Sequence, residues 1–192
     1  PWVFSESIVK INSDAKSGDL AIIFGKRKNG MIGIGLYDAD SPIKIKVIYS
    51  DGKPIQIDDA FFLRKIEKAY QKRLPLLKTE TTSYRLIFGE NDEFPSLIAD
   101  VYDVVLVVKL YSEIWLPYLK TVLESLIRTS GCETVVIRLS RSLQQSSSYN
   151  LKDGEVVYVI LHNEVAPCTE PHFNLSDNYI NGHKTGYYLH HE

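Results

Sequence analysis

The N-terminal fold is decided by the stretch Met31-Ile32-Gly33-Ile34-Gly35-Leu36-Tyr37 and by the stretch after it, Ile43-Lys44-Ile45-Lys46-Val47-Ile48-Tyr49. The second stretch alternates apolar and basic residues, which is the period of a half-buried strand. Gly33 and Gly35 lie on one face of the first stretch, where a neighbouring backbone can approach closely or the strand can bend. With the short apolar run Leu20–Phe24, these stretches predict a compact β unit of the barrel type.

A helix is predicted after the β unit, because apolar residues recur at helical spacing from Phe61 to Tyr70. Asp58 or Asp59 can cap its start, and Pro75 is expected to end it. Residues 78–83 are polar enough to form a linker. The sequence therefore predicts one domain over residues 1–76 and a second over residues 80–180.

The second half is predicted to be a small α+β sandwich. The expected strands cover residues 84–88, 96–100, 104–108, 135–137 and 156–160. An amphipathic helix is expected between Leu116 and Ile127, and residues 140–150 are expected to form a mobile loop. Strands that frame a helix on one side favour this two-layer arrangement.

Charge is distributed unevenly along the chain. The 192 residues carry a formal charge of −2, and 44% of them are hydrophobic, which excludes a disordered chain. Residues 1–78 carry a net charge of +5, and residues 79–192 carry −7. This asymmetry indicates two units with different partners, the first of which would attract an anionic ligand such as nucleic acid. Ordinary scatter in composition is the alternative.

Several classes of protein are not supported by the sequence. No apolar run reaches the ~18 residues of a transmembrane helix, and no secretory signal is visible. Cys132 and Cys168 stand alone, without the spacing of a disulfide framework or a zinc site. We therefore expect a reduced, cytoplasmic protein that binds neither a membrane nor a metal.

The basic residues of the first unit are the best candidates for contacts with RNA. The aromatic residues Trp2, Tyr37 and Tyr49 could stack on unpaired bases beside them. The alternative is a solvated hairpin whose aromatic residues lie in the core. The predicted RNA-binding residues are Lys10, Lys26, Arg27, Lys28, Lys44 and Lys46.

No self-contained catalytic site is visible in the sequence. Glu90, Asp92 and Glu93 favour a solvated acidic turn over a cation site. The stretch 181–188 combines two glycines with Lys184 and Thr185, and such a segment can bind an anionic group. The histidines lack the spacing of a zinc site and are His172, His183, His190 and His191.

Three segments, in chain order, resemble a known family. Pro1-Trp2-Val3-Phe4-Ser5, Gly18-Asp19-Leu20 and Gly35-Leu36-Tyr37 are similar to the N-terminal PUA domain of ribosomal RNA cytosine-5 methyltransferases. Tyr84-Arg85-Leu86, followed by Gly89-Glu90-x-Asp92-x-Phe94-Pro95, resembles the central-domain signature of that family. Gly182-His183-Lys184-Thr185-Gly186-Tyr187-Tyr188-Leu189 resembles the motif that opens its catalytic domain.

The resemblance implies a PUA-like RNA-binding domain, a central α+β domain and, over residues 181–192, the start of a truncated catalytic domain. The Rossmann-like domain that binds S-adenosylmethionine would then be absent or truncated. The nucleophilic cysteine of the family belongs to that last domain, and neither Cys132 nor Cys168 matches it. Lys184, Thr185 and Gly186 are the residues that the resemblance implies for cofactor binding.

The function expected from these observations is RNA binding by the N-terminal region of an S-adenosylmethionine-dependent rRNA (cytosine-5) methyltransferase. The alternative is a non-catalytic RNA-binding or assembly module that has lost its methyltransferase domain or is separated from it. A protein-interaction role for the acidic second unit is a third option. Ribosomal RNA is the expected partner, and the sequence leaves open a homodimer and whether the chain itself is an enzyme.

Overall fold

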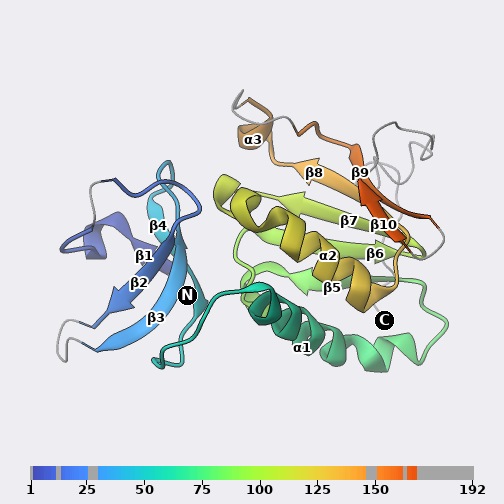
Figure 1. The fold of residues 1–192 in the computed structure, drawn as a ribbon, viewed down its shortest axis with the longest axis horizontal. Coiled ribbons are helices and arrows are strands. Elements are labelled where there is room, and N and C mark those ends of the chain that lie inside the picture. Colours follow the sequence, from blue (N-terminus) through green and yellow to red (C-terminus); the bar gives the residue numbers. More distant parts are fainter. Residues whose placement is uncertain (1, 12–13, 26–29, 146–150, 162–163, 168–192) are drawn as a thin grey trace.

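The chain folds into two β-sheets joined through a long helix (Figure 1). The computed structural model describes residues 2–11, 14–25, 30–145, 151–161 and 164–167, and side chains as far as residue 157. The first sheet is formed within residues 2–49 and the second within residues 83–167. This mixed α/β architecture agrees with the class of fold predicted from the sequence.

The first sheet has four antiparallel strands in the order β1-β4-β3-β2. Three of them coincide with the predicted stretches, whereas β1 and the turn η1 (Ser5–Ser7) were not predicted as elements. The sheet predicted as a β unit of the barrel type does not close on itself among the described residues, because β1 and β2 do not pair. The strands are β1 (Trp2–Phe4), β2 (Leu20–Phe24), β3 (Met31–Tyr37) and β4 (Ile43–Tyr49).

Gly33 and Gly35 allow β3 and β4 to approach closely. A Cβ atom on Gly35 would lie 2.4 Å from Cγ2 of Ile45, and one on Gly33 would lie 2.6 Å from the carbonyl oxygen of Tyr49. The pairing of the two strands shifts register between Ile34 and Gly35. The close approach predicted from the glycine spacing is therefore confirmed, because a side chain at either position would collide with β4.

The second sheet has the order β10-β9-β8-β7-β6-β5 and is antiparallel except for the pair β7 and β8. That parallel pair is connected by the turn η3 (Glu113–Tyr118) and the helix α2 (Leu119–Ser130), as a parallel connection requires. The strands are β5 (Ser83–Phe88), β6 (Leu97–Tyr102), β7 (Val105–Leu110), β8 (Thr134–Leu139), β9 (Glu155–Leu161) and β10 (Glu164–Pro167).

Helix α1 (Asp59–Leu77) starts as predicted and ends later than predicted. The Asp58 side chain caps it by accepting a hydrogen bond of 2.8 Å from the Phe61 amide. The helix continues through Pro75 to Leu77, so the prediction that Pro75 ends it was wrong. The predicted loop after β8 is also partly helical, because residues Arg141–Gln145 form α3.

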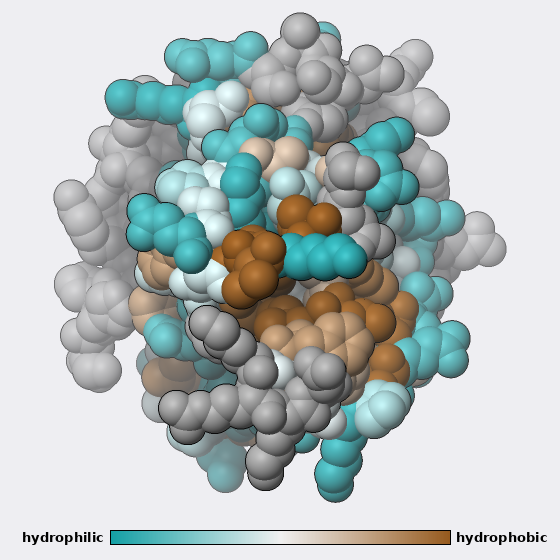
Figure 2. All heavy atoms as spheres, turned by 90° about the vertical axis from the view of Figure 1, so that its left-hand side faces the viewer, coloured by the Kyte–Doolittle hydropathy of each residue, from teal (hydrophilic) through white to brown (hydrophobic). Residues whose placement is uncertain are grey.

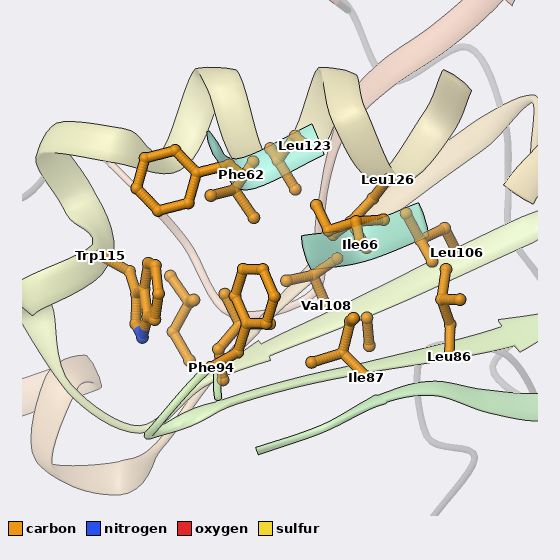
Figure 3. Packing of buried hydrophobic residues seen from close by; sticks show 14 of the residues in the cluster. Phe62, Ile66, Leu86, Ile87, Phe94, Leu106, Val108, Trp115, Leu123 and Leu126 are labelled. Carbon is orange, nitrogen blue, oxygen red and sulfur yellow. The ribbon is translucent and has the colours of Figure 1, made fainter. Parts of the chain in front are cut away.

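The main core lies between the second sheet and the two helices α1 and α2, which cover the same face of that sheet (Figures 1 and 3). Phe94 and Trp115 stack at 5.4 Å, and the Trp115 indole donates a 2.6 Å hydrogen bond to the Pro95 carbonyl. Leu36 and Ile48 of the first sheet belong to the same buried cluster. The core is thus continuous between the two sheets, and the domain boundary predicted near residues 76–80 stays a prediction.

Polar contacts also join the first sheet to the second half of the chain. Asp38 and Lys46 form a buried ion pair, and the Ser112 hydroxyl donates a 2.6 Å hydrogen bond to the same Asp38 carboxylate. The Tyr118 hydroxyl donates a 3.0 Å hydrogen bond to the carbonyl of Gly18. We call Asp38, Lys46 and Ser112 the buried polar cluster.

Removing the cation of the buried polar cluster should destabilise the fold. Lys46→Met keeps most of the side-chain volume but leaves the Asp38 carboxylate buried without its counter-ion, at an expected cost of about 3–5 kcal/mol in the free energy of unfolding. Urea unfolding at pH 7 measures this cost. Lys120→Met is the matched control, because the Lys120 side chain is 81% exposed. Adding Asp38→Asn to Lys46→Met should restore part of the stability. A loss below ~1 kcal/mol for Lys46→Met would contradict this role of the ion pair.

Candidate nucleic-acid interface

The structure separates the predicted RNA-binding cations of the first sheet. Lys10 is exposed, between β1 and β2. Lys44 is half-buried, and its ammonium group donates to the carbonyl of Ala39. Lys46 is buried and bound to Asp38, so its prediction as an RNA contact was wrong. The alternation of apolar and basic residues placed Lys46 correctly on a strand, but it could not reveal the carboxylate that faces it.

Other predicted site residues lie outside the described residues. The predicted cationic hairpin tip consists of Lys26, Arg27 and Lys28, and the predicted cofactor residues are Lys184, Thr185 and Gly186. The four C-terminal histidines and Cys168 lie outside them as well. These assignments stay predictions.

One of the three predicted stacking residues is well exposed. Trp2 is 50% exposed, and its ring meets that of Phe4 edge-on at 6.5 Å. Tyr37 and Tyr49 are half-buried, and Tyr49 contacts the buried ring of Phe61. Of the three, Trp2 is therefore the best placed to meet a base.

The first sheet carries several exposed apolar side chains besides Trp2, and the sequence gave no reason to select them. Figure 2 looks onto this end of the molecule and shows apolar residues gathered there. Alternate residues of β2 are exposed, as expected for one face of an edge strand. The exposed apolar side chains of the first sheet are Trp2, Phe4, Leu20, Ile22, Phe24 and Ile32.

A second cationic region lies on helix α1, beside a shallow cleft of about 190 Å³. Arg64, Lys68 and Lys72 recur every four residues and so follow one face of the helix. All three line the cleft, whose opposite wall includes Asn91 and Glu93 from the loop after β5. The sequence showed these cations on the predicted helix but gave no reason to assign them a function.

Lys65 holds the base of this cleft together. Its ammonium group forms a 2.7 Å ion pair with Glu93, donates to the Glu93 carbonyl at 3.1 Å and also donates to the carbonyl of Ile48 in β4. It lies over the rings of Phe61 and Phe94. Burial lowers the pKa of Lys65, and the hydrogen bond and charge of Glu93 partly oppose this shift. Lys65 is thus a structural link between the two sheets.

Asp92 is the second charged anchor of the cleft. Its carboxylate accepts hydrogen bonds from Lys72 at 2.8 Å, from Arg73 and from the Phe88 amide at 2.9 Å. Burial raises the pKa of Asp92, but these three donors more than offset it, so the pKa lies below its ordinary value. The prediction of a solvated acidic turn was wrong for Asp92, which is buried. Its carboxylate is paired with Lys72 and Arg73, which lie on helix α1 about twenty residues earlier in the chain.

The described residues show neither a candidate metal centre nor a reactive cysteine. They contain no cluster of three metal-binding side chains, and none of their helices is long and apolar enough to cross a membrane. Burial raises the pKa of the Cys132 thiol, so this cysteine is a core residue and not a nucleophile. The cleft on α1 is smaller than the ~300–1,000 Å³ of a pocket for a drug-sized ligand.

Comparison with known proteins places the first sheet in a recognised class of domain. Residues 1–49 match the family model of the PUA-like domain, and this range coincides with the four-stranded sheet. Two solved structures share the fold over 85% of this chain and 42% of theirs, each with 13% sequence identity. One, from Streptococcus mutans, is assigned as a SAM-dependent methyltransferase (TM-score 0.63), and the other is SMU.776, assigned as a methyltransferase and complexed with SAH (TM-score 0.64).

Curated relatives match nearly the whole chain. A ribosomal RNA large subunit methyltransferase of Deinococcus radiodurans is 34% identical over 98% of this chain and 47% of its own length. Ribosomal RNA large subunit methyltransferase I of Aliivibrio fischeri is 30% identical with the same coverage. The chain is thus homologous to large-subunit rRNA methyltransferases, and it spans about half the length of these relatives.

The network around Asp92 should make stability depend on pH. Because the folded-state pKa is lowered, Asp92 stabilises the fold at pH values above its ordinary pKa of 3.8 and loses this effect as the pH falls through the folded value. Asp92→Asn should therefore cost about 2–3 kcal/mol at pH 7, and the difference from the unmodified chain should shrink below pH ~4. Urea unfolding from pH 7 to pH 3 measures both. Glu124→Gln, on the exposed face of α2, should show no such dependence, and a difference for Asp92→Asn that does not change with pH would contradict the assignment.

Proposed function

We propose that this chain is the RNA-binding part of an S-adenosylmethionine-dependent methyltransferase that acts on large-subunit ribosomal RNA. The observation that carries the proposal is the 34% identity to the Deinococcus radiodurans enzyme, which extends over 98% of this chain. A PUA-like domain over residues 1–49 agrees with a role in holding RNA. The cytoplasm, where ribosomes are made, stays the expected location.

Cytosine C5 is the methylation site that we propose, and S-adenosylmethionine is the methyl donor. The motifs around Tyr84, Asp92 and Lys184 support this choice through their resemblance to cytosine-5 methyltransferases. The solved neighbour complexed with SAH supports the use of this cofactor in proteins of the same fold. The second candidate function, a non-catalytic RNA-binding module, is supported by the PUA-like match over residues 1–49.

Loss of the gene distinguishes the two functions. Cells without it should lack one 5-methylcytosine of the large-subunit RNA, as measured by bisulfite sequencing, and the gene with its natural flanking sequence should restore the modification. An unchanged methylation pattern would overturn the methyltransferase proposal. If the chain still bound large-subunit RNA in that case, the non-catalytic function would remain.

The predicted hairpin tip gives a direct test of RNA binding by the first sheet. Replacing Lys26, Arg27 and Lys28 by Gln should weaken binding of the chain to a large-subunit rRNA fragment. It should also lower the slope of log K against log salt by about 2, because each cation that neutralises a phosphate adds about 0.7 for single strands. Fluorescence anisotropy at several salt concentrations measures both quantities. Unchanged affinity and slope would count against an RNA contact at this tip.

A further inference from the structure

Helix α1 presents a row of cations, two of which, Arg64 and Lys68, neither the ion pairs of the described residues nor the PUA-like domain account for. We propose that Arg64 and Lys68 form a second RNA-binding surface, which takes the phosphate backbone of a strand. This inference deepens the proposed function and rests on it, since RNA is the ligand in both. It differs from that function in placing the contact on the helix between the sheets, outside the range of the PUA-like match.

The row has the geometry of a linear phosphate-binding surface. Arg64, Lys68 and Lys72 are four residues apart, and each step of four residues advances ~6 Å along a helix. Arg64 and Lys68 are exposed, so their charged groups can reach a ligand without a change in the fold. A row of point charges on a rigid helix suits a polyanion better than it suits a single compact anion.

The pairing of charges around the row singles out two of its members. Lys72 is held by Asp92, and the neighbouring Lys65 is held by Glu93. Among the described residues, Arg64 and Lys68 have no carboxylate within ion-pair distance. Like charges at i and i+4 destabilise a helix by about 0.2–0.5 kcal/mol. The mutual repulsion of Arg64, Lys68 and Lys72 therefore does not stabilise the helix. A bound polyanion would offset this repulsion.

Arg64 and Lys68 also form a ridge between two hollows. On one side is the cleft of about 190 Å³. On the other side is an open depression whose lining adds Glu67 and Gln71 and, from the end of α2, Arg128. A strand lying along the ridge would thus meet a further cation and an amide group beyond it, with the Glu67 carboxylate between them. Arg64, Lys68 and Arg128 outnumber this single carboxylate in the depression.

The chemistry of the cleft favours a backbone contact over base stacking or cofactor binding. Phe61 is 4% exposed, and the ammonium group of Lys65 lies 5.1 Å from the centre of its ring, so this ring is closed to a base. The lining has four cations, Arg64, Lys65, Lys68 and Lys72, against the two carboxylates Asp92 and Glu93. The cleft, at about 190 Å³, is smaller than the ~300–1,000 Å³ of a pocket for a drug-sized ligand.

The test is RNA binding by the double variant Arg64→Gln/Lys68→Gln of the full chain. With a large-subunit rRNA fragment as the probe, affinity at 0.1 M salt should fall on the order of tenfold, and the salt slope should fall by about 1.4. The control Lys78→Gln/Lys120→Gln removes the same charge from exposed positions away from the cleft and should keep the wild-type slope. Thermal unfolding should show the double variant to be as stable as the unmodified chain, because no ion pair is lost.

The outcomes separate this inference from the proposed function. RNA binding by the unmodified chain, with a slope that Arg64→Gln/Lys68→Gln leaves unchanged, would overturn the second surface and leave the proposed function in place. A complete lack of RNA binding by the unmodified chain would overturn both. A lower slope in the double variant and in the control alike would mean that net charge, and not this row, attracts the RNA, which would also overturn the second surface.

Discussion

The buried polar cluster of Asp38, Lys46 and Ser112 is the contact on which the arrangement of the two sheets depends. It places the ion pair of Asp38 and Lys46 against Ser112 at the start of η3. Because both charges are buried, the loss of either one would destabilise the fold. Lys65 adds a second link from α1 to the backbone of β4. Because the apolar core is continuous across the same region, the PUA-like sheet and helix α1 are held in one fixed relation. RNA bound by one would therefore be presented to the other at a defined position.

The elements of the fold followed from the sequence wherever the local pattern was complete. The strand β4, the glycines of β3 and the Asp58 cap of α1 each depend on a few neighbouring residues, and each is confirmed. The half-buried period predicted for β4 is not seen, because residues 45–48 are all buried. Some differences are local, such as the continuation of α1 past Pro75 and the short helix α3. The others concern relations between distant residues. A three-residue strand such as β1 has too little pattern to be recognised, and whether a sheet closes into a barrel depends on the edges that meet in space.

The candidate site also combines features that the sequence predicted with contacts that only the folded structure shows. The resemblance pointed to the PUA-like domain and to rRNA methyltransferases, and the comparisons agree with both. Sequence alone could not separate Lys46, which is neutralised by Asp38, from Lys68, which has no such partner among the described residues. It also could not show that Asp92 is buried by Lys72 and Arg73, because that contact spans about twenty residues. Charge is visible in a sequence, but its pairing is a property of the folded chain.

The central claim is that one RNA is held jointly by the PUA-like sheet and by helix α1. Ultraviolet crosslinking of a large-subunit rRNA fragment to the chain, followed by mass spectrometry of the crosslinked peptides, tests it most directly. The account predicts crosslinked peptides from within residues 2–49 and from within residues 59–77 on the same RNA fragment. Crosslinks confined to the strands of residues 83–167 would contradict it.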